Sequence, residues 1–487
     1  RDPVRAVDAK DNATAMSWSQ GLLRELVDAT GAKVGFDYDE FGQLSGVTNG
    51  VGDTWRILHD QAGRIRETIT PLGYRTVLSY DDAGHLVSRV DPDGAHWVYS
   101  YDPAGNLETV TAPDGGQTSY TWCPDGQVAS ITDPAGATTT YAYDGLGDLS
   151  AIGLPGGVQW QFLRDAMSRL CQLTDPAGGR WRANYGVNGD ITSVVDPTGV
   201  RQSLTTKGHQ DQVTNATGRV VAARTWDDYG RLTSTTDVFG ATERIDYDEC
   251  GLPTALTDST GAITRFDHDA AGRLTTVTSP GGLVHRYGYD ATGRLATMTN
   301  PAGATTHYHY DADGRLTTRI DPTGETTCHS WDAAGRLTRT TIGDVVTYSA
   351  CYDACGRPIR IWDPVAATRH FTWDATGHLI SAVDPTGGVH RYAWDKRGRL
   401  AICTDATGAL TTYRYTDLDQ LAEITHPNGT TTKYTWDDAG HLTSHTASDG
   451  TTTGYETIDG VEVVTINGEM STRTSWDINA HTLHIAD

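Results

Sequence analysis

The stretch from Tyr289 to Ser330 decides the fold. It reads YDATGRLATMTNPAGATTHYH and then YDADGRLTTRIDPTGETTCHS, two copies of one 21-residue unit. Each copy contains two turn signals, Asp290 to Gly293 and Asn300 to Gly303 in the first. Glycine supplies positive φ, proline presets φ near −65°, and aspartate accepts hydrogen bonds from its own turn. Strand-forming Thr, Val, Tyr and Leu lie between the turns, so the unit predicts an antiparallel β-meander.

Positions in the unit are counted from the leading aromatic residue as zero. Glycine recurs at positions 4 and 14, and aromatic residues at positions 19 and 21 share one face because side chains alternate along a strand. The glycines that we select as structural turn residues are Gly84, Gly94, Gly105, Gly293, Gly303, Gly314, Gly324 and Gly335. The repeat aromatics are Tyr80, Tyr101, Tyr289, Tyr310, Trp331, Trp373, Trp394 and Trp436.

One register runs along most of the chain. Leading residues recur every 21 residues from Tyr38 to Tyr185 and from Trp226 to Trp436, and the longer step between Tyr185 and Trp226 hides one degraded copy. The glycine rule fails at Ser168 and Asp419 (position 4) and at Val345 and Ala366 (position 14). A fixed period of this length predicts a single repeat architecture of about 21 units. We expect an array over 17–449, an irregular N-terminal segment or cut point over 1–16, and a degenerate C-terminal repeat or cap over 450–487.

Charge and hydropathy restrict the partners. The net charge of −24 is spread along the chain, whereas nucleic acid or an anionic membrane requires Lys and Arg concentrated on one surface. We therefore expect no nucleic acid partner and no membrane insertion by this segment, which also lacks an apolar run of 18 residues. The first residues include neither Met nor an apolar signal core, so we expect a processed or excised piece of a longer protein.

Candidate chemistry is sparse. Seven scattered cysteines imply no disulfide framework, although Cys351 and Cys355 flank one turn, and both a bridge and separate buried thiols stay open for them. His307 and His309 share a strand face without a carboxylate or thiol to complete a zinc site. Recurring Asp residues are explained as turn caps better than as calcium ligands. No nucleophile motif is present, so we expect no enzyme activity, no catalytic or metal site and no cofactor.

The Tyr-Asp-x-x-Gly-Arg-Leu core of Tyr289–Leu295 and Tyr310–Leu316, followed by Asp-Pro-x-Gly, resembles the YD repeat of the Rhs family. This family includes bacterial polymorphic toxins, encapsulating subunits of insecticidal toxin complexes and animal teneurins. The resemblance implies an all-β hairpin strip wound into a curved or spiral shell that encloses a C-terminal toxin. It also implies a plug and toxin cargo in the same polypeptide as partners, and a secreted or exported, cell-surface-associated bacterial protein. No segment here matches the family's protease-like plug.

Two alternatives remain. In function, the repeats could form a cell-surface adhesion or carbohydrate-binding module, with Tyr and Trp stacking on glycans. In architecture, two units make a four-stranded blade of 42 residues, which is close to the length of a β-propeller blade. Identical turns in successive units disfavour the propeller, because a blade needs different inner and outer hairpins.

Overall fold

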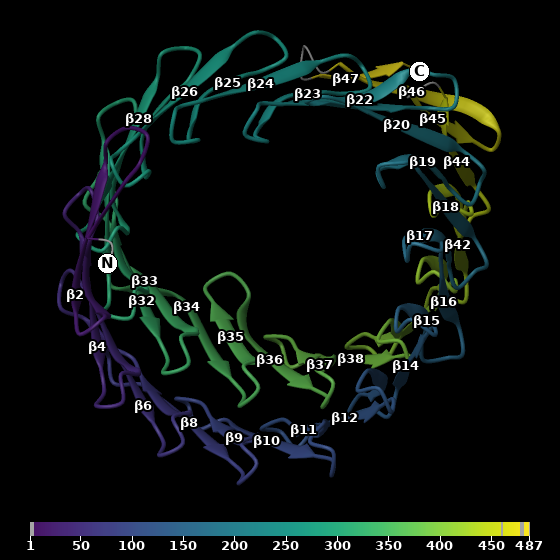
Figure 1. Ribbon diagram of the computed structural model, residues 1–487. Helices are drawn as coiled ribbons and strands as arrows, with labels where there is room; N and C mark the ends of the chain where they lie inside the picture. Colours follow the sequence, from purple (N-terminus) through teal and green to yellow (C-terminus); the bar gives the residue numbers. More distant parts are fainter. Residues whose placement is uncertain (1–3, 459–460, 478–481, 487) are drawn as a thin grey trace. The chain divides into compact units, whose positions relative to one another are not determined.

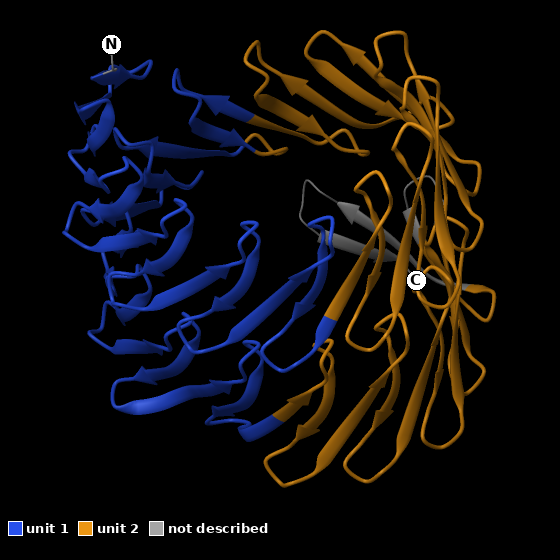
Figure 2. Ribbon diagram, turned by 60° about the horizontal axis from the view of Figure 1, so that its bottom comes forward, with its two compact units in different colours: residues 1–117, 245–257, 262–370 blue, residues 118–244, 258–261, 371–487 orange. Residues whose placement is uncertain are grey.

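The computed structural model describes residues 4–458, 461–477 and 482–486, and the elements in it are β-strands (Figure 1). These ranges contain 47 strands and no helix, which confirms the all-β prediction. The chain divides into two compact units (Figure 2). Unit 1 comprises residues 1–117, 245–257 and 262–370, and unit 2 comprises 118–244, 258–261 and 371–487.

The strands of unit 1 are mostly five or six residues long. In its first stretch they are β1 (Arg5–Val7), β2 (Ala13–Ser19), β3 (Leu22–Val27), β4 (Lys33–Tyr38), β5 (Leu44–Asn49), β6 (Thr54–His59), β7 (Ile65–Ile69), β8 (Arg75–Tyr80), β9 (Leu86–Val90), β10 (His96–Tyr101) and β11 (Leu107–Thr111). In its later stretches they are β25 (Pro253–Thr257), β26 (Ile263–His268), β27 (Leu274–Thr278), β28 (Val284–Tyr289), β29 (Leu295–Thr299), β30 (Thr305–Tyr310), β31 (Leu316–Ile320), β32 (Thr326–Trp331), β33 (Leu337–Ile342), β34 (Val345–Tyr352) and β35 (Pro358–Asp363).

Unit 2 repeats the same pattern. Its first stretch contains β13 (Val128–Thr132), β14 (Thr138–Tyr143), β15 (Leu149–Gly153), β16 (Gln159–Arg164), β17 (Leu170–Thr174), β18 (Arg180–Tyr185), β19 (Ile191–Val195), β20 (Arg201–Lys207), β21 (Gln210–Thr214), β22 (Val220–Trp226) and β23 (Leu232–Thr236). Its last stretch contains β37 (Leu379–Val383), β38 (Val389–Trp394), β39 (Leu400–Thr404), β40 (Leu410–Tyr415), β41 (Leu421–Thr425), β42 (Thr431–Trp436), β43 (Leu442–Thr446), β44 (Thr452–Ile458), β45 (Val461–Ile466), β46 (Glu469–Asp477) and β47 (Thr482–Ala486). The strands β12 (Gln117–Trp122), β24 (Thr242–Tyr247) and β36 (Ala367–Trp373) contain a unit boundary.

Strand pairing within each unit is antiparallel and follows the sequence order. In unit 1, Met298 of β29 pairs with Thr306 of β30, and Tyr308 of β30 pairs with Arg319 of β31. The ladder therefore continues from one repeat into the next, whereas a propeller requires a break after every blade. The hairpin-strip prediction is confirmed and the β-propeller alternative is wrong.

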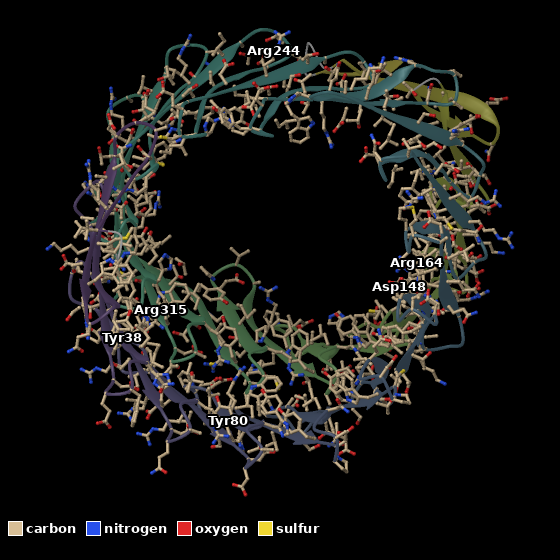
Figure 3. All side chains as sticks on the ribbon, in the orientation of Figure 1. Tyr38, Tyr80, Asp148, Arg164, Arg244 and Arg315 are labelled. Atoms are coloured by element: carbon tan, nitrogen blue, oxygen red, sulfur yellow. The ribbon has the colours of Figure 1, made fainter. Side chains whose placement is uncertain are left out.

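Each strip has two different faces and a thin core. Along β30, Tyr308 and Tyr310 are half-buried while His307 and His309 are exposed. We call the side that carries Tyr308 and Tyr310 the aromatic face. Few side chains are fully buried, Thr306 at 5% exposure among them, because a single sheet layer is covered only by neighbouring side chains. Figure 3 shows side chains projecting from both faces of the ribbon.

Departures from the repeat rule keep the backbone conformation. Ser168 and Asp419 replace glycine at position 4 and have φ of 59° and 64°. Ala366 stands where the repeat has glycine at position 14, and there the neighbouring Ala367 has the positive φ, 48°. In the repeat where Val345 stands at position 14, Gly343 forms the turn instead, with φ of 56°. The repeat therefore requires a left-handed residue at each turn, and glycine is its usual but not its obligatory form.

The two ends also contain strands. The strand β1 and part of β2 lie within residues 1–16, and β44–β47 lie within 450–487. The predicted C-terminal cap also includes residues 459–460, 478–481 and 487, which lie outside the described residues. The three-part division of the chain therefore stays a prediction.

Candidate functional site

The first turn of the unit is organised by its aspartate. In the copy that begins at Tyr289, the Oδ1 of Asp290 accepts hydrogen bonds from the backbone amides of Thr292 (2.9 Å) and Arg294 (3.0 Å). The amide of Gly293 donates to the carbonyl of Asp290 at 3.0 Å, and Gly293 has φ of 84°. This Asx-turn leaves Oδ2 of Asp290 for a second partner.

That partner is the arginine at position 5, which links one repeat to the next. Arg294 donates from Nε to Oδ2 of Asp290 at 2.9 Å and from Nη1 to the carbonyl of Asp311 in the following repeat at 3.0 Å. Its guanidinium lies 4.9 Å from the ring centroid of Tyr310. The same ion pair with the aspartate four residues earlier is made by Arg64, Arg169, Arg231, Arg273, Arg315, Arg336, Arg357 and Arg399. This arginine belongs to the Tyr-Asp-x-x-Gly-Arg-Leu motif, but we predicted no role for it from the sequence, although its constant four-residue distance from Asp was the available signal.

The leading aromatic makes a third link between repeats. The hydroxyl of Tyr310 donates to the carbonyl of Leu295 at 2.8 Å, and the indole nitrogen of Trp331 donates to the carbonyl of Leu316 at 2.9 Å. Equivalent bonds are made by Tyr80, Tyr101, Tyr289, Trp394 and Trp436. Trp373 occupies the same position at the end of β36. The recurring core of the unit is thus a set of contacts that hold neighbouring hairpins together on the aromatic face.

In one repeat the arginine of this contact stands at position 0 instead of position 5. Arg164 replaces the leading aromatic, and Asp148 replaces the arginine of the preceding unit. Arg164 Nε lies 3.9 Å from Asp148 Oδ1. Arg164 ends β16 and Asp148 directly precedes β15, and both residues are labelled in Figure 3. The contact between position 5 and the next position 0 is therefore kept as an ion pair where the cation–π pair is lost.

The environment of these groups shifts their ionisation. The Arg169 side chain, which is the largest influence, lowers the pKa of Asp165, and hydrogen bonds from backbone amides act in the same direction. Burial raises the pKa of Asp290, but the bonds from Thr292 and Arg294 outweigh it and hold this pKa below its ordinary value. Burial, together with the neighbouring Tyr348, raises the pKa of Tyr352 to about 12. The carboxylates are thus stabilised as anions and the phenol as a neutral donor.

The selected turn glycines have left-handed backbones. Their φ values lie between 80° and 97° at Gly84, Gly94, Gly105, Gly293, Gly303, Gly314, Gly324 and Gly335. At the second turn of the unit, Asp321 Oδ1 accepts the amides of Thr323 and Glu325. Both edges of the strip therefore consist of tight turns whose polar groups are satisfied locally.

In unit 1, two edges of the strip meet. Arg336 Nη2 lies 2.8 Å from Asp93 Oδ2, and Arg357 Nη2 lies 2.8 Å from Asp114 Oδ2, a pair separated by 243 residues. The hydroxyl of Thr70 donates to Asp313 Oδ2 at 3.0 Å. We call this contact the edge joint. On one side of the joint lie the first turns of the repeats in residues 311–357, together with their arginines at position 5. On the other side lie the second turns, of the Asp-Pro-x-Gly type, in residues 70–114.

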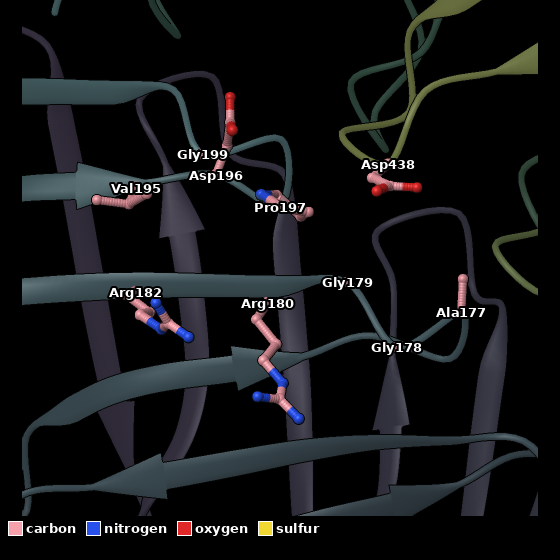
Figure 4. Close-up of a pocket in the computed structure, with 10 residues that line it drawn as sticks. All are labelled: Ala177, Gly178, Gly179, Arg180, Arg182, Val195, Asp196, Pro197, Gly199 and Asp438. Atoms are coloured by element: carbon pink, nitrogen blue, oxygen red, sulfur yellow. The ribbon is translucent and has the colours of Figure 1, made fainter.

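Each unit has a cavity, open to solvent, where strip edges approach. In unit 1 a cavity of about 520 Å³ is bordered by Asp93, Trp97, Arg315 and Arg336 among others. In unit 2 a cavity of about 340 Å³ lies between Asp438 and the turns of residues 177–199 (Figure 4). Its wall also carries Arg180 and Arg182. These cavities belong to the packing of one edge on another.

The groups that we considered for chemistry do not assemble. Within residues 4–458, 461–477 and 482–486, no three His, Cys, Asp or Glu side chains are placed to hold a metal ion. The seven cysteines are free thiols, so Cys351 and Cys355 are not bridged. Burial raises the pKa of the Cys355 thiol. In the described part of the chain, no helix is long and apolar enough to cross a membrane.

Geometry and sequence together define the class of this protein, a β-hairpin repeat scaffold whose recurring residues serve turns and links between repeats. The family model described as RHS Repeat matches residues 18–54, 59–96, 80–117, 124–158, 143–180, 247–284, 268–306, 289–326, 310–344, 352–389, 394–431 and 415–452. These segments include more than half of the sequence, and the chain belongs to the RHS-repeat family. No curated protein sequence matches it.

The fold is similar to that of solved toxin structures. A crystal structure of TcdB2-TccC3 aligns with a TM-score of 0.54 at 13% identity, and the alignment covers 97% of this chain and 38% of that one. The Photorhabdus luminescens Tc holotoxin pore aligns with a TM-score of 0.44 at 15% identity, over 96% of this chain and 27% of that one. This chain therefore spans well under half the length of these structures, and the first likeness shows a shared fold.

Proposed function

We propose that this chain is a non-catalytic wall segment of an exported bacterial RHS-repeat protein, and that the complete protein encloses a C-terminal toxin and helps to deliver it. The observation that carries the proposal is the linkage of successive hairpins. Arg294 and Tyr310 hold adjacent repeats together without a thick core, so the chain can form an extended single-layer sheet. Such a sheet separates two volumes, as a container wall must.

The ion pairs between strip edges support the same role. In unit 1 one strip edge is sealed against another by Arg336–Asp93 and Arg357–Asp114, whose side chains are 16–23% exposed. A wall built from a strip needs such seals, because unsealed edges would leave slits between the turns. The plug and the toxin cargo of the parent polypeptide are the partners in this proposal, and the chain itself needs no cofactor.

The proposal is tested by comparing residues 1–487 alone with the full-length parent. We expect the isolated chain to be non-toxic when expressed and to show no self-cleavage, while the parent shows both cargo toxicity and proteolytic processing. Toxicity or self-cleavage of the isolated chain would contradict a purely structural role.

A second experiment addresses the wall directly. In the parent, Asp93→Ala with Asp114→Ala should open the edge joint and expose the enclosed cargo to an added protease. Asp82→Ala removes an exposed turn carboxylate and serves as the matched control. Equal protection of the cargo in both variants would contradict the sealing role of the joint.

A further inference from the structure

One face of the later strip of unit 1 carries concentrated positive charge. The strands β26–β36 present Arg265, Arg286, Arg339 and Arg360 on the side opposite the aromatic face, and all four side chains are exposed. His307, His309 and His370 share this side. The single acidic residue on these described strand faces is Asp267, since the other carboxylates of residues 263–370 occupy turns, strand ends or the aromatic face. We call this surface the arginine face.

Strand register shows that these residues share one face. Cross-strand partners point to the same side of a sheet. Arg265 pairs with Thr278, and Thr276, two residues away on the same strand, pairs with Arg286. Arg286 also pairs with Thr299, and Thr297, two residues away on that strand, pairs with His307. Further pairs join His309 to Thr318, Thr318 to Cys328, Ser330 to Arg339, Arg339 to Ser349, Cys351 to Arg360 and Arg360 to His370.

The corresponding face of the early strip in the same unit is different. On β3–β7 the carboxylates of Glu25, Asp37 and Glu67 lie among the basic residues. Lys33 pairs with Glu25 at 3.6 Å, and Arg75 pairs with Glu67 at 2.8 Å. The repeat itself therefore does not impose a basic face, and the charge of β26–β36 is a local property in a chain whose net charge is −24.

The acidic turns do not cancel this field. At physiological salt the screening length is about 8 Å, and the edges of a six-residue strand lie about 10 Å from its middle. The four arginines span the ten strands from β26 to β35, about 45 Å along the strip. A long anionic ligand matches this distribution better than a single small anion does.

The other side chains on this face suit a carbohydrate. Threonines alternate with the arginines on the intervening strands, for example Thr276, Thr297 and Thr318. Trp362 lies two residues after Arg360 on β35, so its side chain points to the same face, and its partner Thr368 likewise lies two residues from His370. Trp362 is half-buried. Hydroxyls and imidazoles bond sugar hydroxyls, and an indole offers a flat apolar platform.

We propose that the arginine face binds a linear polysaccharide that carries sulfate or carboxylate groups. Guanidinium groups recognise both anions through paired hydrogen bonds. Single-stranded nucleic acid fits less well, because it requires successive aromatic platforms and Trp362 stands alone on this face within β26–β36. The inference is independent of the container role proposed above, since it concerns the face opposite the aromatic links.

Immobilised heparin is the probe, with neutral dextran as the reference surface, and the full 487-residue chain is the analyte. We expect the chain to bind heparin at 50 mM salt, to bind less at 300 mM, and not to bind dextran. Arg286→Glu with Arg339→Glu should weaken heparin binding by about tenfold or more, because each substitution removes a cationic hydrogen-bond donor and adds a charge that repels the anionic chain.

The control is Arg56→Glu with Arg66→Glu, which makes the same charge change at exposed positions on the early strip. Circular dichroism establishes that both variants keep their β-structure. Heparin affinity that falls equally in both variants would reduce the effect to net charge and overturn the assignment. Absence of heparin binding by the unsubstituted chain at 50 mM salt would also overturn it. Competition by oligo(dT) as strong as that by soluble heparin would refute the polysaccharide class.

Discussion

Replacement of Arg336 by alanine tests both kinds of contact that hold this protein together. Arg336 donates to Asp332 Oδ2 at 2.7 Å and to the carbonyl of Asp353 at 3.2 Å, lies over Tyr352 at 5.1 Å, and pairs with Asp93 across the edge joint. Arg294 makes the same three contacts within its strip. Arg294→Ala is therefore the matched control for the contribution of the joint.

The expected magnitudes follow from these contacts. Two charge-assisted hydrogen bonds and a partly exposed cation–π contact predict a loss of about 2 kcal/mol of local stability for Arg294→Ala. Arg336→Ala should lose about 1 kcal/mol more, because its ion pair with Asp93 is mostly shielded from water. In a double-mutant cycle, Arg336→Ala and Asp93→Ala should show a coupling of about 1 kcal/mol that decreases at 1 M salt.

Hydrogen exchange read by mass spectrometry is the suitable assay, because repeat proteins open locally before they unfold globally. Arg336→Ala should accelerate exchange in its own turn, in the next repeat and in the turn of residues 91–95. Arg294→Ala should accelerate exchange only in residues 290–315. The reasoning is refuted if the turn of residues 91–95 responds equally to both substitutions, or if the coupling with Asp93 is below about 0.3 kcal/mol.

Three further predictions concern the repeat turn and its ionisable groups. Gly335, with φ of 80°, should tolerate Asn at about 1 kcal/mol but lose about 1–3 kcal/mol of stability with Val, as measured by urea unfolding; equal losses would contradict the left-handed requirement. Because the folded state lowers the pKa of Asp290 and of the equivalent Asp165, the free energy of unfolding should hold above the unfolded value of about 3.9 and fall as the pH drops below it. Asp290→Asn removes the titrating carboxylate and should flatten that acid limb, and an unchanged slope would count against the stabilisation of the Asp290 anion. The raised pKa of Tyr352, about 12, contributes stability that is complete below about pH 10 and is lost as the pH rises through the folded value; a phenolate absorbance titration of Tyr352→Phe should lack one of the late-ionising groups.

Local turn chemistry could be predicted because each turn is specified within five consecutive residues. Asp290 and Gly293 define a reversal by themselves, and their recurrence every 21 residues predicts the hairpin order without any knowledge of distant contacts. Ser168 and Asp419 broke the glycine rule in the sequence yet also have a positive, left-handed φ. The sequence rule was stricter than the physical requirement, which is a left-handed residue and not glycine as such.

The sequence alone determined the all-β strip, its 21-residue period and its membership of a YD-repeat family, because strand alternation and turn geometry are short-range properties. Only the tertiary structure decided that arginines at position 5 also contact a second strip edge, since Asp93 and Arg336 lie far apart in the sequence. It also decided which side chains share the arginine face: each YD turn shifts the strand register by one residue, as between His309 and Tyr310. A one-residue shift moves side chains to the other face, so spacing in the sequence does not reveal such a surface until the pairing is known.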